Sequence, residues 1–180
     1  MEQYYVKELK IEELKAGLLS RFDRYQKVKR VWYNVAGTWV LKDDPFVEQW
    51  SDEKKDEIVL TEMAECVNSS GAVWGVFNPN SEVIGFAILS AEPLGSGRQY
   101  LKLAQLHISY GHRGGGIGKK LFLACAHKAK EMGASKLYIS GHSSEESQGF
   151  YKAVGCVDVE EPDQHSVDLE PYDRQLEYCL

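Results

Sequence analysis

A glycine-rich turn between an expected strand and an expected helix carries the clearest chemistry in this sequence. Residues 106–121 read LHISYGHRGGGIGKKL, an apolar run followed by glycines and then by an amphipathic segment. Glycines lack a Cβ, so backbone N–H groups can converge on an anion, and the positive end of the following helix dipole strengthens the attraction. Arg113 and Lys119 add positive charge at the same turn. The turn therefore predicts a phosphate-binding site.

Three phosphate-binding patterns can be compared with this turn by their spacing. A Walker A loop requires glycine where Arg113 stands and serine or threonine where Lys120 stands, so it does not fit. A dinucleotide fingerprint that starts at Gly116 meets Leu121 in place of its last glycine, so it does not fit either. The remaining pattern is Arg-x-x-Gly-x-Gly at Arg113, Gly116 and Gly118. It resembles the acyl-CoA pyrophosphate loop of the GNAT N-acetyltransferase superfamily.

A second segment carries the same resemblance. In the superfamily, a helix of the form Asn-x-x-Ala-x-x-Phe-Tyr-x-x-x-Gly-[Phe/Cys] follows the loop and the next strand. The segment that begins at Ser144 reads SEESQGFYKAVGC and matches this form at Phe150 and Tyr151. Ser144 and Ser147 replace the usual asparagine and alanine, so the register is kept while the asparagine amide is lost. The resemblance is specific over residues 100–157.

The resemblance implies a GNAT-like fold of the α/β, mixed α+β class, as a single domain over residues 1–180. Its central sheet would be mixed but mostly antiparallel, with about 6–7 strands, flanking helices and a splay at the acyl-CoA site. Residues 25–41, with aromatic side chains around Gly37, fit either a hairpin or an irregular arm. Hydrophobic periodicity predicts strands at 4–9, 72–77, 82–89, 100–109, 136–140 and 174–180, and helices at 12–22, 51–67, 116–132 and 144–154.

The resemblance also implies how acetyl-CoA, the co-substrate, would bind. Its pantetheine arm would pair with exposed strand backbone as an added strand, and a backbone N–H there would stabilise the oxyanion by about 2.7–4 kcal/mol. The glycine-rich turn would hold the pyrophosphate, and no metal is expected. The expected cofactor-binding residues are Leu106, His107, Ile108, Arg113, Gly114, Gly115, Gly116, Ile117, Gly118, Lys119, Ser144, Ser147 and Phe150.

Tyr151 stands where the superfamily has the tyrosine that protonates the departing thiolate. An ordinary tyrosine pKa of about 10 keeps the hydroxyl protonated at neutral pH, as a general acid requires. The alternative is that Tyr151 only packs beside Phe150.

The general base is left open. Lys102 occupies the position of the strand glutamate that serves some members, and a lysine is a poor base there. His142 ends the strand before the Tyr151 helix and has an ordinary pKa of about 6.5, so it is a catalytic candidate. The alternative is that His142 caps residues 143–144. Glu62 and Glu65 lie on the helix that borders the acceptor site in the superfamily, where each would serve as base, bind a cation or face solvent.

Other side chains have simpler interpretations. Trp32, Tyr33 and Trp39 would form a wall of the acceptor pocket or pack in the core. Cys125 falls on the apolar face of the 116–132 helix, so we expect a core residue rather than a nucleophile. The remaining histidines, His112, His127 and His165, are expected at the surface.

Composition limits the partners. The 180 residues hold 21 Lys+Arg and 27 Asp+Glu, and the net charge of −6 disfavours nucleic acid and anionic lipid and weakly favours cationic partners. No apolar stretch approaches the ~18 residues that span a bilayer, and the first residues do not resemble a signal peptide. The four cysteines have no C-x-x-C spacing and are expected to be reduced, which predicts a cytoplasmic protein.

The resemblance to the GNAT superfamily implies an acyl-CoA-dependent N-acetyltransferase. It would move an acetyl group from acetyl-CoA to a primary amine of a small molecule or peptide by direct attack in a ternary complex, and a homodimer is compatible with the sequence. The missing strand glutamate supports one alternative, a catalytically silent acyl-CoA sensor. A nucleotide-phosphate enzyme is the third and weakest.

Overall fold

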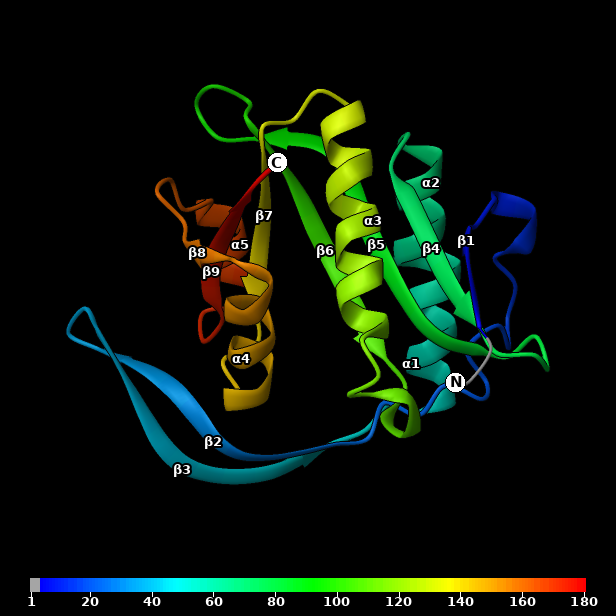
Figure 1. The fold of residues 1–180 in the computed structure, drawn as a ribbon, viewed down its shortest axis with the longest axis horizontal. Coiled ribbons are helices and arrows are strands. Elements are labelled where there is room, and N and C mark those ends of the chain that lie inside the picture. The colour runs from blue at the N-terminus through cyan, green and yellow to red at the C-terminus, as the bar shows by residue number, and fades with distance from the viewer. Residues whose placement is uncertain (1–3) are drawn as a thin grey trace.

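The computed structural model describes residues 4–180, and a seven-stranded sheet forms its centre (Figure 1). The strands lie in the order β1–β4–β5–β6–β7–β9–β8. Every neighbouring pair is antiparallel except β6 and β7, which are parallel, so the expected mixed, mostly antiparallel sheet is confirmed. The strands are β1 (Tyr5–Glu8), β4 (Ala72–Phe77), β5 (Val83–Leu94), β6 (Tyr100–Ile108), β7 (Lys136–Gly141), β8 (Val157–Asp158) and β9 (Arg174–Cys179).

Strands β6 and β7 are paired only near their N-terminal ends. Their register runs from Tyr100 opposite Lys136 to Lys102 opposite Tyr138. Beyond these residues the two strands diverge, as Figure 1 shows, while β6 stays paired with β5 as far as Ile108. The backbone of β6 is therefore unpaired on the side of β7, and the predicted splay is confirmed.

Helices cover both faces of the sheet. The helix α3 (Ile117–Glu131) packs on one face together with α4 (Glu145–Val154). A continuous helical segment packs on the other face, as predicted for 51–67; it consists of α1 (Asp52–Glu57), a π-helical stretch (Ile58–Met63) and α2 (Ala64–Asn68). Alternating side chains of β5 serve the two cores, Phe86 on one side and Ala87 on the other. Within residues 4–180, no helix is both long and apolar enough to span a membrane.

The prediction of a helix over residues 12–22 is wrong. Only a short 3₁₀ turn (Ile11–Glu13) forms there, and Gly17 adopts a φ of +82°, a left-handed conformation that ends regular helix. The Gly17 N–H donates to Asp56 Oδ1 at 2.7 Å instead of bonding within a helix. Leu19 and Phe22 are nevertheless fully buried. The apolar spacing thus reflected burial of an irregular segment against α1 and its continuation.

Residues 26–48 form a long hairpin outside the main sheet, so the hairpin interpretation of the aromatic arm is confirmed. Strand β2 (Gln26–Val35) pairs with β3 (Thr38–Glu48), and the turn between them places Ala36 and Gly37 at φ values of 50° and 86°. The hairpin runs past one end of α4, on the side where β6 and β7 have diverged (Figure 1). The Trp32 N–H donates to the Ser143 carbonyl at 2.8 Å, which fixes the hairpin to the β7–α4 junction.

Two elements between α4 and β9 were not predicted. Strand β8 is short. The helix α5 (Gln164–Leu169) is capped by Asp163, whose carboxylate accepts the Ser166 N–H at 2.8 Å. The connection after α5 carries residues 169–173 to the side of the hairpin, where both line one cavity.

Candidate active site

The glycine-rich turn between β6 and α3 has the geometry of an open cradle. Gly114 and Gly116 both adopt a φ of +81°, which side-chain-bearing residues rarely take. A Cβ built on Gly114, Gly115 or Gly116 meets no atom within 4 Å. The protein itself therefore leaves space over this backbone that a side chain would fill, at the N-terminus of a fifteen-residue helix. The turn fits the pyrophosphate of an acyl-CoA.

The other residues of the turn differ in how they are used. Gly118 is a packing position, because a Cβ there would lie 3.3 Å from the Phe150 ring. Ile117 is buried in the core, so only its backbone faces the turn. The Arg113 Nε donates to the Ile108 carbonyl at 2.9 Å, while Lys119 is exposed. The roles of Arg113 and Lys119 toward a phosphate remain predictions.

The end of β6 has the expected alternation of faces. Leu106 and Ile108 pack against the core under α3, whereas the His107 ring lies 4.9 Å from Trp50 on the opposite face. Burial, followed by the positive charges of Arg24 and Arg113, lowers the pKa of His107 to about 3. His107 is therefore neutral at physiological pH. Its ring packs on the opposite face, so only its backbone is available to a ligand in the splay.

Tyr151 lies on α4 beside the end of β7. A Cβ at Gly141 would lie 3.2 Å from its ring, so glycine is needed there for this close approach, and Phe150 packs edge-on at 5.3 Å. The Tyr151 hydroxyl forms no hydrogen bond with any residue in 4–180. Burial, with smaller contributions from nearby groups that include Asp173, raises the Tyr151 pKa. The hydroxyl thus stays protonated and unpaired, as a proton donor requires.

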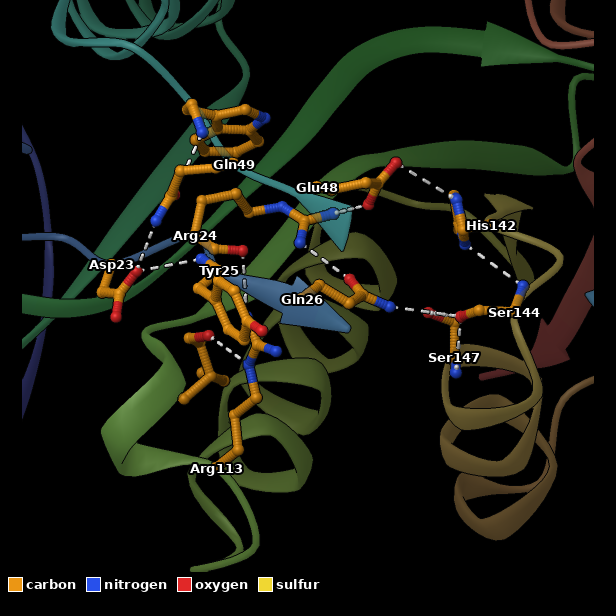
Figure 2. Close-up of polar contacts among 12 residues, drawn as sticks. Asp23, Arg24, Tyr25, Gln26, Glu48, Gln49, Arg113, His142, Ser144 and Ser147 are labelled. Carbon is orange, nitrogen blue, oxygen red and sulfur yellow. Dashed lines mark hydrogen bonds and ion pairs between the residues drawn. The ribbon is translucent and has the colours of Figure 1, made fainter. Parts of the chain in front are cut away.

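Five residues from three distant segments form a closed ring of polar contacts (Figure 2). Arg24 donates from Nη1 to Gln26 Oε1 at 2.7 Å and from Nη2 to Glu48 Oε2 at 2.8 Å. The ring continues through Gln26 Nε2, which donates to Ser144 Oγ at 3.3 Å. It closes through His142, whose Nε2 lies 3.4 Å from Glu48 Oε1 and whose Nδ1 accepts the Ser144 N–H at 3.1 Å. This polar ring joins the base of the hairpin to the β7–α4 junction.

The polar ring decides how His142 is used. Both of its ring nitrogens are engaged, so the predicted alternative, that His142 caps residues 143–144, is confirmed. The hydrogen bond with Glu48 is the main cause that raises the pKa of His142. In return, His142 and then Arg24 lower the pKa of Glu48 to about 2. No lone pair of the imidazole is free to receive a substrate proton in this arrangement.

Ser144 and Ser147 organise the start of α4. Ser144 is fully buried, and its hydroxyl oxygen accepts the Ser147 N–H at 3.3 Å as the helix N-cap. The two hydroxyls are also hydrogen-bonded to each other at 3.0 Å. Ser144 exposes no surface in this structure. The contact of the two serines with a cofactor stays a prediction.

A cavity of about 700 Å³ lies between the hairpin, the end of β7 and the α5–β9 connection. Burial and the neighbouring Glu170 raise the pKa of Asp173 to about 6, which reflects the crowding of negative charge there. Tyr33 belongs to the wall, as expected for the aromatic arm, while Trp39 instead lies against Arg174 at 5.0 Å. The lining is aromatic and acidic: it includes Tyr33, Phe46, Tyr172, Asp44, Glu170, Asp173 and His142.

The remaining candidate residues either contact other side chains, face solvent or lie in the core. Lys102 donates to Ser166 Oγ at 2.9 Å, and Glu62 accepts a hydrogen bond from Gln105. Glu65 is exposed, and Cys125 is fully buried in the core, as predicted. The described residues contain no group of three or more His, Cys, Asp or Glu side chains placed to hold a metal ion.

A sheet that splays at its parallel pair, an open glycine cradle at the start of α3 and an unpaired tyrosine beside the splay together define an acyl-CoA-dependent acyltransferase. Comparison with known proteins agrees: residues 35–156 match the family described as "Acetyltransferase (GNAT) family". The chain belongs to this family, whose members transfer acetyl groups from acetyl-CoA. A search of curated proteins found no significant match.

Solved structures share the fold at low sequence identity. A putative streptothricin acetyltransferase from Bacillus anthracis, solved with acetyl coenzyme A, has a TM-score of 0.70 at 16% identity, covering 97% of this chain and 96% of its own. A nourseothricin acetyltransferase has a TM-score of 0.64 at 13% identity, with 97% and 95% covered. The PaiA N-acetyltransferase from Thermoplasma acidophilum, solved with coenzyme A, has a TM-score of 0.59 at 16% identity, with 99% of each chain covered.

Proposed function

We propose that this acetyltransferase moves the acetyl group of acetyl-CoA to a primary amine of a cationic acceptor, by direct attack in a ternary complex. The observation that carries the proposal is the acidic and aromatic cavity beside the β7–α4 junction. Carboxylates attract ammonium groups, and aromatic faces stabilise cations that lie over them. An anionic acceptor would meet Asp44, Glu170 and Asp173 in the same cavity.

The cavity and the cradle lie on two sides of the splay. Acetyl-CoA would place its pyrophosphate over Gly114–Gly116 and its pantetheine arm along the unpaired backbone of residues 106–108. An acceptor in the cavity would then approach the acetyl group from the side of β7. Tyr151, on α4, would protonate the leaving thiolate.

The proposal favours an enzyme over a silent acyl-CoA sensor. Tyr151 keeps an unpaired hydroxyl within the described structure, and a cavity suited to a second substrate is present. A sensor needs neither feature. A single domain over residues 1–180 is part of the proposal, supported by the polar ring that joins the hairpin to the sheet. A cytoplasmic location and a homodimer remain predictions.

The proposal is tested by measuring CoA release with a panel of acceptors. The panel should contain monoamines, polyamines, aminoglycosides, amino acids and lysine peptides, together with streptothricin and nourseothricin, for which two of the similar structures are named. We expect amine-dependent release that is fastest with polycationic acceptors. Acetyl-CoA binding without release for any amine would instead support the sensor, and tighter binding of ATP than of CoA would contradict both.

A further inference from the structure

The acceptor ammonium must lose a proton before its nitrogen can attack, and most titratable groups near the splay are already engaged. Both nitrogens of His142 are engaged within the polar ring. Glu48 is bound to Arg24 and His142 and has a lowered pKa, so it is a weak proton acceptor. Lys102 is a cation that donates to Ser166.

Asp173 differs from all of these groups. It lines the cavity, and its backbone is held on both sides: the N–H donates to the Glu170 carbonyl at 3.0 Å and the carbonyl accepts Gln175 Nε2 at 3.3 Å. Its carboxylate forms no hydrogen bond or ion pair with any residue in 4–180. Asp173 is thus a fixed residue with an unpaired carboxylate at the wall of the cavity.

The groups that act on Asp173 come from four segments of the chain. Glu170 precedes it on the same connection, Glu48 ends β3, His142 follows β7 and Lys102 lies on β6. Burial and the two glutamates raise the pKa of Asp173 to about 6, against the lowering effects of His142 and Lys102. A carboxylate with this pKa is a better proton acceptor at neutral pH than an ordinary one. Its charge also reaches Tyr151, the candidate acid.

We propose that Asp173 binds the reacting ammonium of the acceptor and accepts its proton, while His142 is a positioning residue that ties the hairpin to the β7–α4 junction. The inference rests on the proposed function, and it replaces His142 as the predicted base. Two observations support it: an unpaired carboxylate in the wall of the cavity, and the electrostatic effect of that carboxylate on Tyr151.

The proton and electron balance of the step is complete. Asp173 takes one proton from R–NH₃⁺, and the free lone pair then attacks the thioester carbonyl carbon. The new C–N bond forms and the C–S bond breaks, with its electron pair remaining on sulfur. Tyr151 gives sulfur a proton and regains one from the substituted nitrogen. The proton on Asp173 passes to water, so the net products are the amide, CoA–SH and one proton.

Asp173→Asn tests the inference, with Asp44→Asn as the matched control because it removes a carboxylate from the same cavity. Single-turnover acetyl transfer would be measured with the best amine from the panel from about pH 5 to about pH 9. This range runs from about one unit below the pKa of Asp173 to well above it. A fluorinated analogue of that amine, which is neutral at the assay pH, would be compared. Acetyl-CoA affinity would be measured by calorimetry, and His142→Gln would be assayed in parallel.

With the ordinary amine, we expect Asp173→Asn to lose ~10²–10³-fold in rate and to lose the acidic limb near pH 6. With the neutral amine the loss should shrink to about tenfold or less, since no proton has to be removed before attack. Asp44→Asn and His142→Gln should raise KM while the acidic limb remains. Acetyl-CoA affinity should not change in Asp173→Asn.

Equal losses with both amines would overturn the inference and leave Asp173 as a binding residue only. A wild-type rate and pH profile in Asp173→Asn would also overturn it, while the proposed function would stand. If wild-type protein bound acetyl-CoA but acetylated no amine, the proposed function would fail and the inference with it.

Discussion

The two ends of the splay are built in different ways. The cradle is made of consecutive backbone, with Gly114 and Gly116 held at positive φ and space left open above them. The cavity proposed for the acceptor is lined by side chains from segments far apart in the sequence, such as Asp44, His142 and Asp173. A backbone cradle suits an invariant group such as a pyrophosphate, whereas a side-chain cavity can be altered without changing the fold. If the cavity binds the acceptor as proposed, substitutions in it should change acceptor recognition without changing acetyl-CoA binding at the cradle.

Among the variants considered, the greatest loss of activity is expected at Tyr151, the candidate general acid. Tyr151→Phe keeps the ring against Gly141 and Phe150 and removes only the hydroxyl, so single-turnover transfer should fall ~10²–10⁴-fold. Acetyl-CoA affinity should stay close to that of the wild type. A wild-type single-turnover rate across pH 6 to 9, which brackets a thiol pKa of about 8.5, would show that Tyr151 only packs.

The cradle can be broken without touching the cavity. Gly116→Ala should weaken acetyl-CoA binding by about tenfold or more, because its Cβ enters the open space and its φ of +81° becomes strained. Gly133→Ala is the matched control, since Gly133 has a φ of +93° and equally open space but lies after α3. Calorimetry should show normal affinity for Gly133→Ala; equal losses in the two variants would mean that strain alone is responsible.

Gly115→Ala tests the cradle without adding backbone strain. Gly115 has no positive φ and no neighbour within 4 Å of its Cβ, so the free protein should keep its stability. Any loss of acetyl-CoA affinity would then come from the ligand meeting the methyl group. Unchanged affinity would argue against a phosphate over this residue.

The polar ring gives a smaller effect, on stability and its pH dependence. The Glu48 pKa falls from 4.5 to about 2 on folding, so Glu48 contributes stability above pH 4.5 that is lost as the pH falls toward 2. Allowing for solvent screening, Glu48→Gln should cost about 1–2 kcal/mol at pH 7. Urea unfolding at pH 7 and pH 3 should show a smaller difference between variant and wild type at the lower pH. A difference independent of pH would rule out this linkage.

The effect of Asp173 on stability should be smaller still than that of Glu48. Its pKa rises from 3.8 to about 6 on folding, so its favourable contribution is complete below pH 3.8 and is lost as the pH rises through 6. Asp173→Asn should therefore be more stable than the wild type at pH 8, relative to pH 4, by about 1 kcal/mol. Thermal unfolding at the two pH values checks this. A destabilised variant at pH 8 would show that the carboxylate has a partner at the cavity wall.

Those parts of the fold that depend on residues close together in the chain could be predicted from the sequence. The Arg-x-x-Gly-x-Gly pattern at Arg113 located the cradle, and the Phe150–Tyr151 pair located the helix beside the splay. Most sheet strands followed from their alternation. These features are readable because backbone conformation and hydrophobic periodicity are set by residues a few positions apart.

The cavity and the polar ring could not be predicted without the folded structure. Apolar spacing over 12–22 predicted a helix, but Gly17 and its bond to Asp56 hold an irregular segment there. Nothing near His142 in the sequence indicated that Glu48 would occupy one of its nitrogens, nor that Asp173 would share its cavity. Charges and hydrogen bonds act through space, so pairing and pKa values depend on which distant residues the fold brings together.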